Sequence, residues 1–549
     1  MTFDHRRGRS FDAVYRIPYD GVPTETPSKE VVGSKAHNLM IMAQQGLPVP
    51  PAFVFGVDLC RAFLEGGDRA LDGLEKRLPE ELDRLGASLR RRFGDARKPL
   101  LVSVRSGAAV SMPGMMETVL NVGLTAQAVR GLIRLTGNPR LAHDCRRRLI
   151  QQFAEVVHGA DARIFEKLVA DKLRAERLDD PGRLGSESIA EIAAASLSAF
   201  ESALHLPFPE DPLEQLRATI RAVLASWSSE RAVAYRRANG IDDRAGTAVI
   251  VQAMVFGNAG ALSGSGVGFT RSPVDGSDAL YIDYLPNAQG EDVVAGRRSA
   301  LGTIELETRA PAAFLQLQSF KPVLERAFAD MQDFEFTIED GRLYFLQCRG
   351  GKRTPLAALR ISCDLVAAGL IDPATGLSHL EGLDLNSVGA EALVVDDNAV
   401  LVARGVSASA GVASGVAIFD PTRISQIAAG GAPMILFREF AETADYQALR
   451  QVTGLVTAQG ARTSHAAVVA RQLGKVCIVG CRDLQIDDSG RGGRIGEHVL
   501  QEGDLLSIDG GDGAIYKGAL PVRKERPDGL IAMVDSWRTE TRRDASCAG

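Results

Sequence analysis

The sequence has few of the features that mark a secreted, membrane-bound or cysteine-ligated metal protein. Its 549 residues include 7 cysteines, an odd number, and no CxxC pair, so neither a disulfide framework nor a cysteine metal site is indicated. No run of about 18 apolar residues occurs, which excludes a recognisable membrane span. The first residues are basic but no apolar segment follows them, so we expect no secretory signal and a cytoplasmic location.

Aromatic residues and excess charge are also scarce. Aromatics make up 6% of the chain, and a net charge of -6 with a pI near 5.9 gives no general attraction to nucleic acid or acidic lipid. The length and the 45% hydrophobic content are those of a globular chain of about two to four domains. We therefore expect small molecules or proteins as partners, with no nucleic acid and no membrane.

Helix and strand signals divide the chain into segments. Short helices and strands alternate from about 25 to 120, residues 125–235 form a helical block, and strand signals return from 246 to 349. Residues 351–398 are predicted to be a linker with some structure of its own. Residues 399–520 are predicted to form a small α/β domain and residues 521–549 a flexible tail. The expected fold is multidomain, of α/β and α+β type.

The helical block contains a clear apolar stripe in "LAHDCRRRLIQQFAEVVHG". Residues at helical spacing predict one buried face, and Gly159 is a suitable helix stop. The three arginines Arg146, Arg147 and Arg148 are predicted to lie on the solvated face of this helix. The stripe consists of Leu141, Cys145, Leu149, Phe153 and Val156.

The segment "SVRSGAAVSMPGMMETVLN" joins a strand to a loop of small residues. Ser103 and Arg105 share one strand face because strand side chains alternate. Small side chains let backbone N–H groups approach an anion, and arginine offers a planar donor fork for phosphate. The same pattern also fits a plain turn. The loop "FGNAGALSGSGVGFTRSP", which ends on Arg271, has the same two interpretations, and Lys35 is either a phosphate ligand or an exposed lysine.

The predicted hairpin "DFEFTIEDGRLYFLQCR" places charged and amide side chains on adjacent strands. A two-residue Asp340-Gly341 turn would send the Asp333 set and the Gln347 set to opposite faces. A three-residue loop that includes Glu339 would instead bring them to one face. Converging carboxylates favour a cation such as Mg²⁺ between them, whereas a solvated charged face needs no ligand.

His465 lies at the start of the short predicted helix in "GARTSHAAVVARQLG". With Thr463 or Ser464 as the cap, free backbone N–H groups and the positive end of the helix dipole lie beside the ring. An anion attached to the ring would be stabilised there. The alternative is a buried core histidine. Against this alternative, the domain offers no serine with a paired base and no cluster of metal ligands.

Together these segments resemble the amino-terminal part of the pyruvate, phosphate dikinase family over roughly residues 25–520. The resemblance implies an ATP-grasp nucleotide-binding domain over 1–350, with its helical subdomain at about 125–235, and a swivelling phosphohistidine domain over 399–520. The strings that carry it occur in the family's order and near its spacing: "SVRSGAAVSMPGMMETVLNVGL", "VQAMVFGN", "NAQGEDVVAG", "EFTIEDGRLYFLQCRGGKRT" and "TSHAAVVARQLGK".

The resemblance also implies roles for individual residues. His465 would take a phosphoryl group from the β position of ATP, with Thr463 beside it and Arg105 assisting, while AMP leaves and phosphate becomes pyrophosphate. Glu335 and Gln347 would be ligands of the Mg²⁺ that accompanies ATP. The side chains implied to hold the nucleotide phosphates and metal are Lys35, Arg105, Asp333, Glu335, Gln347 and Arg349.

Several positions depart from the family pattern. Gly460-Ala461-Arg462 replace the usual Gly-Gly-Met before Thr-Ser-His, which adds a cation, and Ala109 stands where a second arginine is common. The resemblance ends before the family's carboxy-terminal pyruvate barrel. We therefore expect a partial enzyme whose acceptor is either pyruvate on a separate barrel subunit or another small molecule.

Three functional hypotheses follow. The leading one is an ATP- and phosphate-dependent phosphotransferase that loads His465. The second uses water in place of phosphate, as phosphoenolpyruvate synthase does. The third is a nucleotide-binding or phosphocarrier module without turnover, and the intact set of phosphate-handling residues argues against it. A homodimer is left open beside a monomer.

Overall fold

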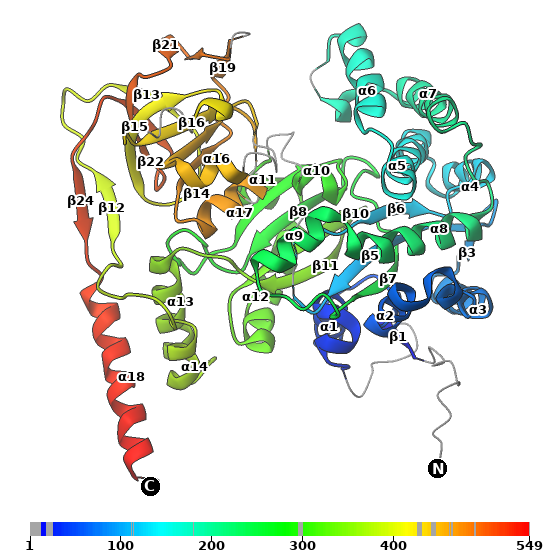
Figure 1. The fold of residues 1–549 in the computed structure, drawn as a ribbon, viewed down its shortest axis with the longest axis horizontal. Coiled ribbons are helices and arrows are strands. Elements are labelled where there is room, and N and C mark those ends of the chain that lie inside the picture. The colour runs from blue at the N-terminus through cyan, green and yellow to red at the C-terminus, as the bar shows by residue number, and fades with distance from the viewer. Residues whose placement is uncertain are drawn as a thin grey trace. The chain divides into compact units, whose positions relative to one another are not determined.

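The computed structural model describes residues 13–17, 26–110, 112, 115–178, 180–294, 300–424, 431–440, 446–460, 462, 465–487 and 490–547. The chain divides into two compact units (Figure 1). Unit 1 is Met1–Ser263 with Leu343–Cys348, and unit 2 is Gly264–Arg342 with Arg349–Gly549. Along these described ranges, no helix has both the length and the apolar character that a membrane span requires.

Unit 1 contains a five-stranded antiparallel sheet of order β1-β2-β7-β5-β6. Phe53, Val104 and Val251 on three adjacent strands are fully buried, which explains why the sequences of these strands are almost entirely apolar. The strands are β1 (Val14–Ile17), β2 (Ala52–Phe55), β5 (Val102–Ala108), β6 (Thr118–Val122) and β7 (Thr247–Ala253). Also in unit 1 are α1 (Lys29–Gln44), α2 (Val57–Gly66), η1 (Gly67–Leu71), α3 (Leu74–Leu89) and the pair β3 (Arg92–Phe93) and β4 (Pro99–Leu100).

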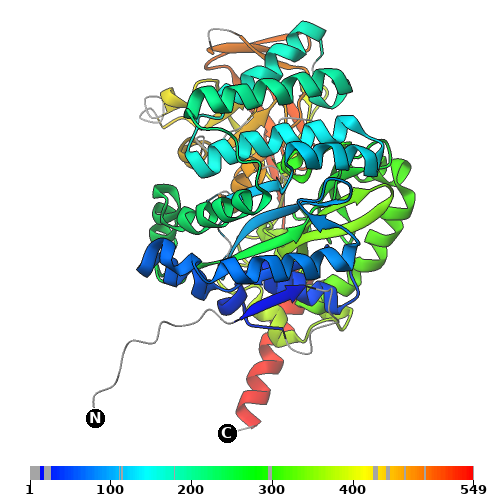
Figure 2. The same cartoon turned by 90° about the vertical axis from the view of Figure 1, so that its right-hand side faces the viewer.

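A block of helices in unit 1 covers the region predicted to be helical. Its helices are α4 (Ala126–Thr136), α5 (Pro139–His158), α6 (Arg163–Glu176), η2 (Pro181–Arg183), α7 (Ser186–Leu204), α8 (Pro212–Ala225), η3 (Ser226–Ser228) and α9 (Glu230–Ala238). Helix α5 packs against α4, α7 and α8, and α6 packs against α7 (Figures 1 and 2). The side chains of Thr125 and Asn138 cap α4 and α5, because each accepts a hydrogen bond from a backbone N–H of the first helical turn.

The arginines of α5 correct one prediction. Arg146 and Arg147 are buried, although the sequence predicts a solvated face. Arg146 pairs with Glu210, and Asp144 accepts Arg147 Nη2 at 2.6 Å and Arg148 Nε at 3.0 Å. Burial would raise the pKa of the Asp144 carboxyl, but Arg147 and Arg148 hold it well below its usual range. The arginines are buried because carboxylates meet them inside the unit.

Unit 2 begins with an antiparallel sheet of order β11-β10-β8-β9. Gly266 and Gly268, from the segment predicted to be a loop of small residues, lie in strand β8. A Cβ at Gly266 would lie 2.4 Å from the Phe336 ring, and a Cβ at Gly268 would lie 2.6 Å from the Phe334 ring. The glycines therefore admit neighbouring rings, and residues 264–269 are a strand rather than a loop. The elements of unit 2 here are β8 (Gly264–Phe269), β9 (Tyr281–Pro286), α10 (Gly290–Val294), α11 (Thr303–Arg309), α12 (Pro311–Phe328) and β10 (Gln332–Glu339). Most of β11 (Arg342–Gly350), residues Leu343–Cys348, belongs to unit 1.

Residues 401–517 of unit 2 form a domain around an eight-stranded sheet, here called the eight-stranded domain. The sheet order is β13-β23-β22-β15-β16-β17-β18-β14, and β15 to β18 pair in parallel. Its strands are β13 (Leu401–Arg404), β14 (Val406–Ser409), β15 (Val412–Ile418), β16 (Met434–Arg438), β17 (Gly454–Thr457), β18 (Val476–Val479), β22 (Leu505–Asp509) and β23 (Ala514–Lys517). The remaining elements are η4 (Pro421–Arg423), α16 (Tyr446–Gln451), α17 (His465–Gln472), β19 (Leu484–Ile486), β20 (Gly492–Ile495) and β21 (His498–Gln501).

The predicted linker and the predicted tail pack together. Leu359 and Leu380 share a buried cluster with Ile531, Val534 and Trp537. The expected flexible tail over 521–549 thus differs from the structure, because its three apolar residues at helical spacing need a partner and find one. The elements are α13 (Pro355–Ala367), α14 (Pro373–Ser378), β12 (Ala390–Leu393), β24 (Val522–Glu525) and α18 (Asp528–Cys547).

The division into units also differs from the single domain predicted for residues 1–350. Residues 264–342 belong to unit 2. The physical reason is a shared core, in which Phe269 and Met331 of the β8–β10 region pack against Ala357, Ile361 and Leu365 of α13. The sheet is therefore tied to the segment that the sequence predicts to be a linker.

Candidate functional site

Lys35 lies beside the strand that carries Arg105. Helix α1 is broken at Gly33, which has φ 77° and ψ 154°. A Cβ at Gly33 would lie 1.9 Å from the carbonyl oxygen of Gly107 in β5, so only glycine permits this approach. Ser34 Oγ donates to the Ala108 carbonyl at 2.9 Å, and Lys35 Cβ is 3.8 Å from the position of a Cβ at Gly107. The second helical run thus follows Gly33 and places Lys35 next to β5.

Arg105 gathers polar groups from distant parts of unit 1. Its Nη1 donates to the Leu346 carbonyl at 2.9 Å and to Gln252 Oε1 at 3.4 Å, and its Nη2 donates to Gln347 Oε1 at 3.5 Å. Gln252 also donates to the Pro50 carbonyl at 3.0 Å. Two predicted site residues, Arg105 and Gln347, are therefore brought together, with a guanidinium and amides that suit phosphate oxygens.

Gln252 is the site residue that sequence reasoning missed. It is buried in β7, directly opposite Ser103 of β5. A signal was present, because Gln252 is the only strongly polar side chain in the apolar run "AVIVQAMV". A buried amide needs hydrogen-bond partners, so such a residue is a candidate for polar clustering.

Asp333 and Arg349 form an ion pair in unit 2. Arg349 Nε donates to Asp333 Oδ2 at 2.7 Å, and Asp333 is 5% exposed. Burial raises the pKa of the Asp333 carboxyl, the Arg349 guanidinium lowers it, and Glu335 raises it further. Glu335 lies two residues along the same strand, on the same face as Asp333. Proton uptake by Asp333 thus depends on its arginine.

The hairpin turn is the two-residue alternative. Asp340 and Gly341 have φ of 47° and 80°, the signature of a tight hairpin turn, and β10 ends at Glu339 while β11 begins at Arg342. A regular ladder from this turn would put Arg349 on the opposite face from Asp333. The two side chains nevertheless form an ion pair, so the Arg349 side chain reaches Asp333.

His465 is the first residue of α17, as the sequence predicts for the helix start. Thr463 and the side chain of His465 lie outside the described residues. The backbone places residue 465 at the positive end of the dipole of α17, which favours an anion. This position suits an imidazole that carries a phosphoryl group.

The predicted metal ligands, Glu335 and Gln347, belong to different units. Among the residues that the structure describes, no three His, Cys, Asp or Glu side chains come together as a metal cluster. Carboxylate and amide oxygens nevertheless fit Mg²⁺, which takes many of its ligands from substrate phosphates and water. The metal assignment stays a prediction.

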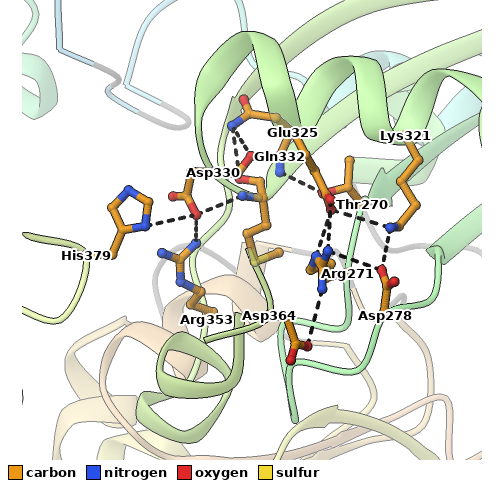
Figure 3. A network of polar contacts seen from close by, with 11 residues as sticks. Thr270, Arg271, Asp278, Lys321, Glu325, Asp330, Gln332, Arg353, Asp364 and His379 are labelled. Carbon is orange, nitrogen blue, oxygen red and sulfur yellow. Dashed lines mark hydrogen bonds and ion pairs between the residues drawn. The ribbon is translucent and has the colours of Figure 1, made fainter. Parts of the chain in front are cut away.

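Arg271 forms ion pairs inside the protein and does not fit the phosphate-binding role that the sequence left open for it. Its Nε and Nη2 donate to Glu325 at 2.9 and 3.1 Å, and both side chains are buried (Figure 3). Asp364 and Asp278 add carboxylates at 3.4 and 3.5 Å, and Lys321 pairs with Asp278. The guanidinium is thus surrounded by protein carboxylates, which leaves it unsuited to a phosphate.

Comparison with known proteins finds two matched regions in this chain. Residues 72–301 match the pyruvate phosphate dikinase AMP/ATP-binding domain, and residues 430–513 match the mobile domain of PEP-utilising enzymes. The chain is 38% identical over 521 residues to pyruvate, phosphate dikinase of Clostridium symbiosum, covering 94% of this chain and 59% of that protein. The Giardia intestinalis enzyme is 41% identical over 498 residues, covering 90% and 56%.

Pyruvate, phosphate dikinase 2 of Zea mays is 37% identical over 545 residues, which cover 98% of this chain and 61% of that protein. The two matched family models thus describe an AMP/ATP-binding domain and a mobile domain. Over 94% of its length the chain is related in sequence to pyruvate, phosphate dikinases. It spans about three fifths of the length of these relatives.

Proposed function

We propose that the chain carries out the nucleotide half-reaction of a pyruvate, phosphate dikinase, in which His465 is phosphorylated from ATP. The observation that carries the proposal is the Arg105 cluster. Arg105, Gln252 and Gln347 converge through hydrogen bonds although they come from distant parts of the chain. Lys35 lies beside the same strand. Such a set of fixed donors suits a polyphosphate, because phosphoryl transfer depends mainly on positioning and charge neutralisation.

The reaction has two balanced steps. The imidazole of His465 attacks the β-phosphorus, the bond to the α-phosphate breaks, and AMP leaves. Inorganic phosphate then attacks the terminal phosphorus, so that pyrophosphate leaves and one phosphoryl group stays on the ring. Lys35 and Arg105 hold the triphosphate, Asp333 fixes Arg349, and the start of α17 stabilises charge on the ring.

Glu335 and Gln347 are the proposed ligands of the Mg²⁺ that accompanies ATP. Their oxygens are of the type that this ion prefers. The ion supplies neutralisation of phosphate charge and fixes the polyphosphate geometry. The proposed acceptor of the phosphoryl group on His465 is pyruvate, as the names of the matching relatives indicate.

Isotope labelling tests the half-reaction. The protein is incubated with ATP labelled at the β or the γ position, with and without inorganic phosphate, and acid-labile label on His465 is measured. With phosphate we expect label from the β position only, because one phosphoryl group stays on the ring. Without phosphate we expect label from both positions, because the terminal phosphoryl group is not removed. The same label without a phosphate requirement would favour water as the co-substrate. No label under any condition would favour a module without turnover.

Replacing Arg349 by Lys is expected to slow the labelling of His465 by about 100-fold or more. Lysine keeps the charge but loses the planar fork that meets Asp333, so the phosphate-handling geometry is lost. The single-turnover rate of labelling measures the effect. Arg342→Lys, at the exposed start of the same strand, is the matched control. A rate near that of the unchanged protein would remove Arg349 from the site.

A further inference from the structure

We infer that Arg462 is a docking residue, which holds the segment that carries His465 against strand β9 during loading. The inference rests on the proposed function, because it assigns a positioning role in the same transfer. It concerns the cation that directly precedes Thr-Ser-His in this sequence. All the contacts that support it lie within unit 2.

The Arg462 side chain contacts two side chains of β9. Its Nε lies 3.8 Å from Asp283 Oδ1, and its guanidinium carbon lies 4.8 Å from the centre of the Tyr281 ring. Tyr281 and Asp283 are two residues apart on one strand, so they share a face. The Tyr281 hydroxyl donates to the Ser407 carbonyl of the eight-stranded domain at 2.7 Å. One strand face thus binds this domain at two adjacent points.

Arg471 connects the docking contact to the helix of the carrier histidine. Its Nη1 donates to the Arg462 carbonyl at 2.9 Å and also to the Ala408 carbonyl. Arg471 lies in the last turn of α17, whose first residue is His465, and its guanidinium is 5.5 Å from the Phe269 ring of β8. The last turn of this short helix is thus hydrogen-bonded to the backbone of residue 462, which links the placement of Arg462 to that of the helix.

Charge complementarity supports one docked arrangement. A pocket at this place is lined by Asp283 and Glu305 from the region of β9 and α11, and by Arg462 and Arg482 from the eight-stranded domain. Arg462 Nη2 also lies 3.0 Å from where a Cβ at Gly302 would be, so the guanidinium reaches the start of α11. Opposite charges that face each other favour one orientation over others.

The contact is also weak enough to be broken. Arg462 is 28% exposed, and its separation from Asp283 is that of an ion pair without a direct hydrogen bond. A phosphohistidine domain must leave the nucleotide before it meets a second substrate, so a strong buried ion pair would slow the cycle. A guanidinium over an aromatic ring is reversible and still directional.

Replacement of Arg462 by Met tests the inference, since Met is unable to pair with Asp283. We expect the rate of His465 labelling to fall about tenfold, with the KM for ATP unchanged, because ATP binds through other residues. Arg462→Lys keeps the charge but loses the planar face, so we expect an intermediate loss. Arg494→Met, which removes an exposed arginine from the same domain, is the control.

A second measurement requires no turnover. Spin labels on non-natural residues at exposed Ser319 of α12 and exposed Glu497 report the distance between these two parts of the full-length protein. We expect a narrow docked distance in the unchanged protein and a broad distribution for Arg462→Met. Asp283→Asn should have the same effect, and the double variant should be no worse than the more impaired single one, because both act on one contact.

The outcomes separate the two proposals. A normal labelling rate together with a normal distance distribution for Arg462→Met would overturn the docking role, while the proposed function would stand. If the unchanged protein showed no phosphohistidine but Arg462→Met broadened the distances, the proposed function would fail and the docking contact would stand. Independent, multiplying effects of Arg462→Met and Asp283→Asn would also overturn the contact.

Discussion

Replacing His465 by alanine is expected to abolish ATP-dependent labelling of the protein while ATP binding stays intact. The physical reason is that the imidazole is the nucleophile of the proposed half-reaction, so its loss removes the atom that would hold the phosphoryl group. The proposed triphosphate ligands Lys35 and Arg105 lie in unit 1, whereas α17 lies in unit 2. Acid-labile label from β-labelled ATP measures the chemistry, and calorimetry with a non-hydrolysable ATP analogue measures binding.

Two further variants make this result specific. His465→Asn keeps a polar side chain at the start of α17 but no nucleophile, so it should be as inactive as alanine. His498→Ala removes a histidine from β21 of the same eight-stranded domain and should label normally. Persistent label in His465→Ala would assign the carrier role to another residue. Loss of ATP binding would show that the nucleotide ligands depend on the carrier segment.

Local structure was predictable because it depends on neighbouring residues. The stripe of Leu141, Cys145, Leu149 and Phe153 is buried on α5, and Gly159 ends that helix in a left-handed conformation, as helical spacing and the glycine predict. The helix start at residue 465 follows from the same kind of signal. Periodicity identifies which side of an element is apolar, whatever that side later contacts.

Partners across the chain were less predictable. The burial of Arg146 and Arg147 depends on Asp144 and Glu210, and the second of these lies on a different segment. Arg271 resembled a phosphate ligand at the end of a glycine-rich stretch, and only the fold shows Glu325 opposite it. Charge patterns along a chain do not reveal which distant carboxylate will meet an arginine, so a solvated face was the natural expectation.

The site was predictable to the level of strand faces. Alternation places Ser103 beside Arg105, and this face does meet Gln252. The contact of Arg105 with Gln347 follows only from the fold, because β11 passes through unit 1 between Leu343 and Cys348. The ion pair of Arg349 with Asp333 also did not follow from the turn rules, which fix the register only close to the turn.

The second large effect concerns stability. Glu325→Ala is expected to lower the free energy of unfolding of unit 2 by about 3–5 kcal/mol, since it leaves the Arg271 cation buried without its main partner. Arg271 is 4% exposed and Glu325 1% exposed at the side chain, and two hydrogen bonds join them (Figure 3). Denaturant unfolding followed by hydrogen exchange in β8 and α12 measures the loss in the relevant unit.

The other carboxylates around Arg271 provide the matched controls. Asp364 and Asp278 are 40% and 59% exposed, so water replaces them when they are removed, and each alanine variant should cost no more than about 1 kcal/mol. Glu325→Gln keeps the packing but loses the negative charge that pairs with Arg271. It should therefore destabilise unit 2 nearly as much as Glu325→Ala. Replacing Glu325 and Arg271 together by Met and Leu should recover much of the stability, since no buried charge remains unpaired. Equal losses for Glu325→Ala and Asp278→Ala would contradict burial as the cause, and a double variant as unstable as Glu325→Ala would show that the pair itself stabilises unit 2.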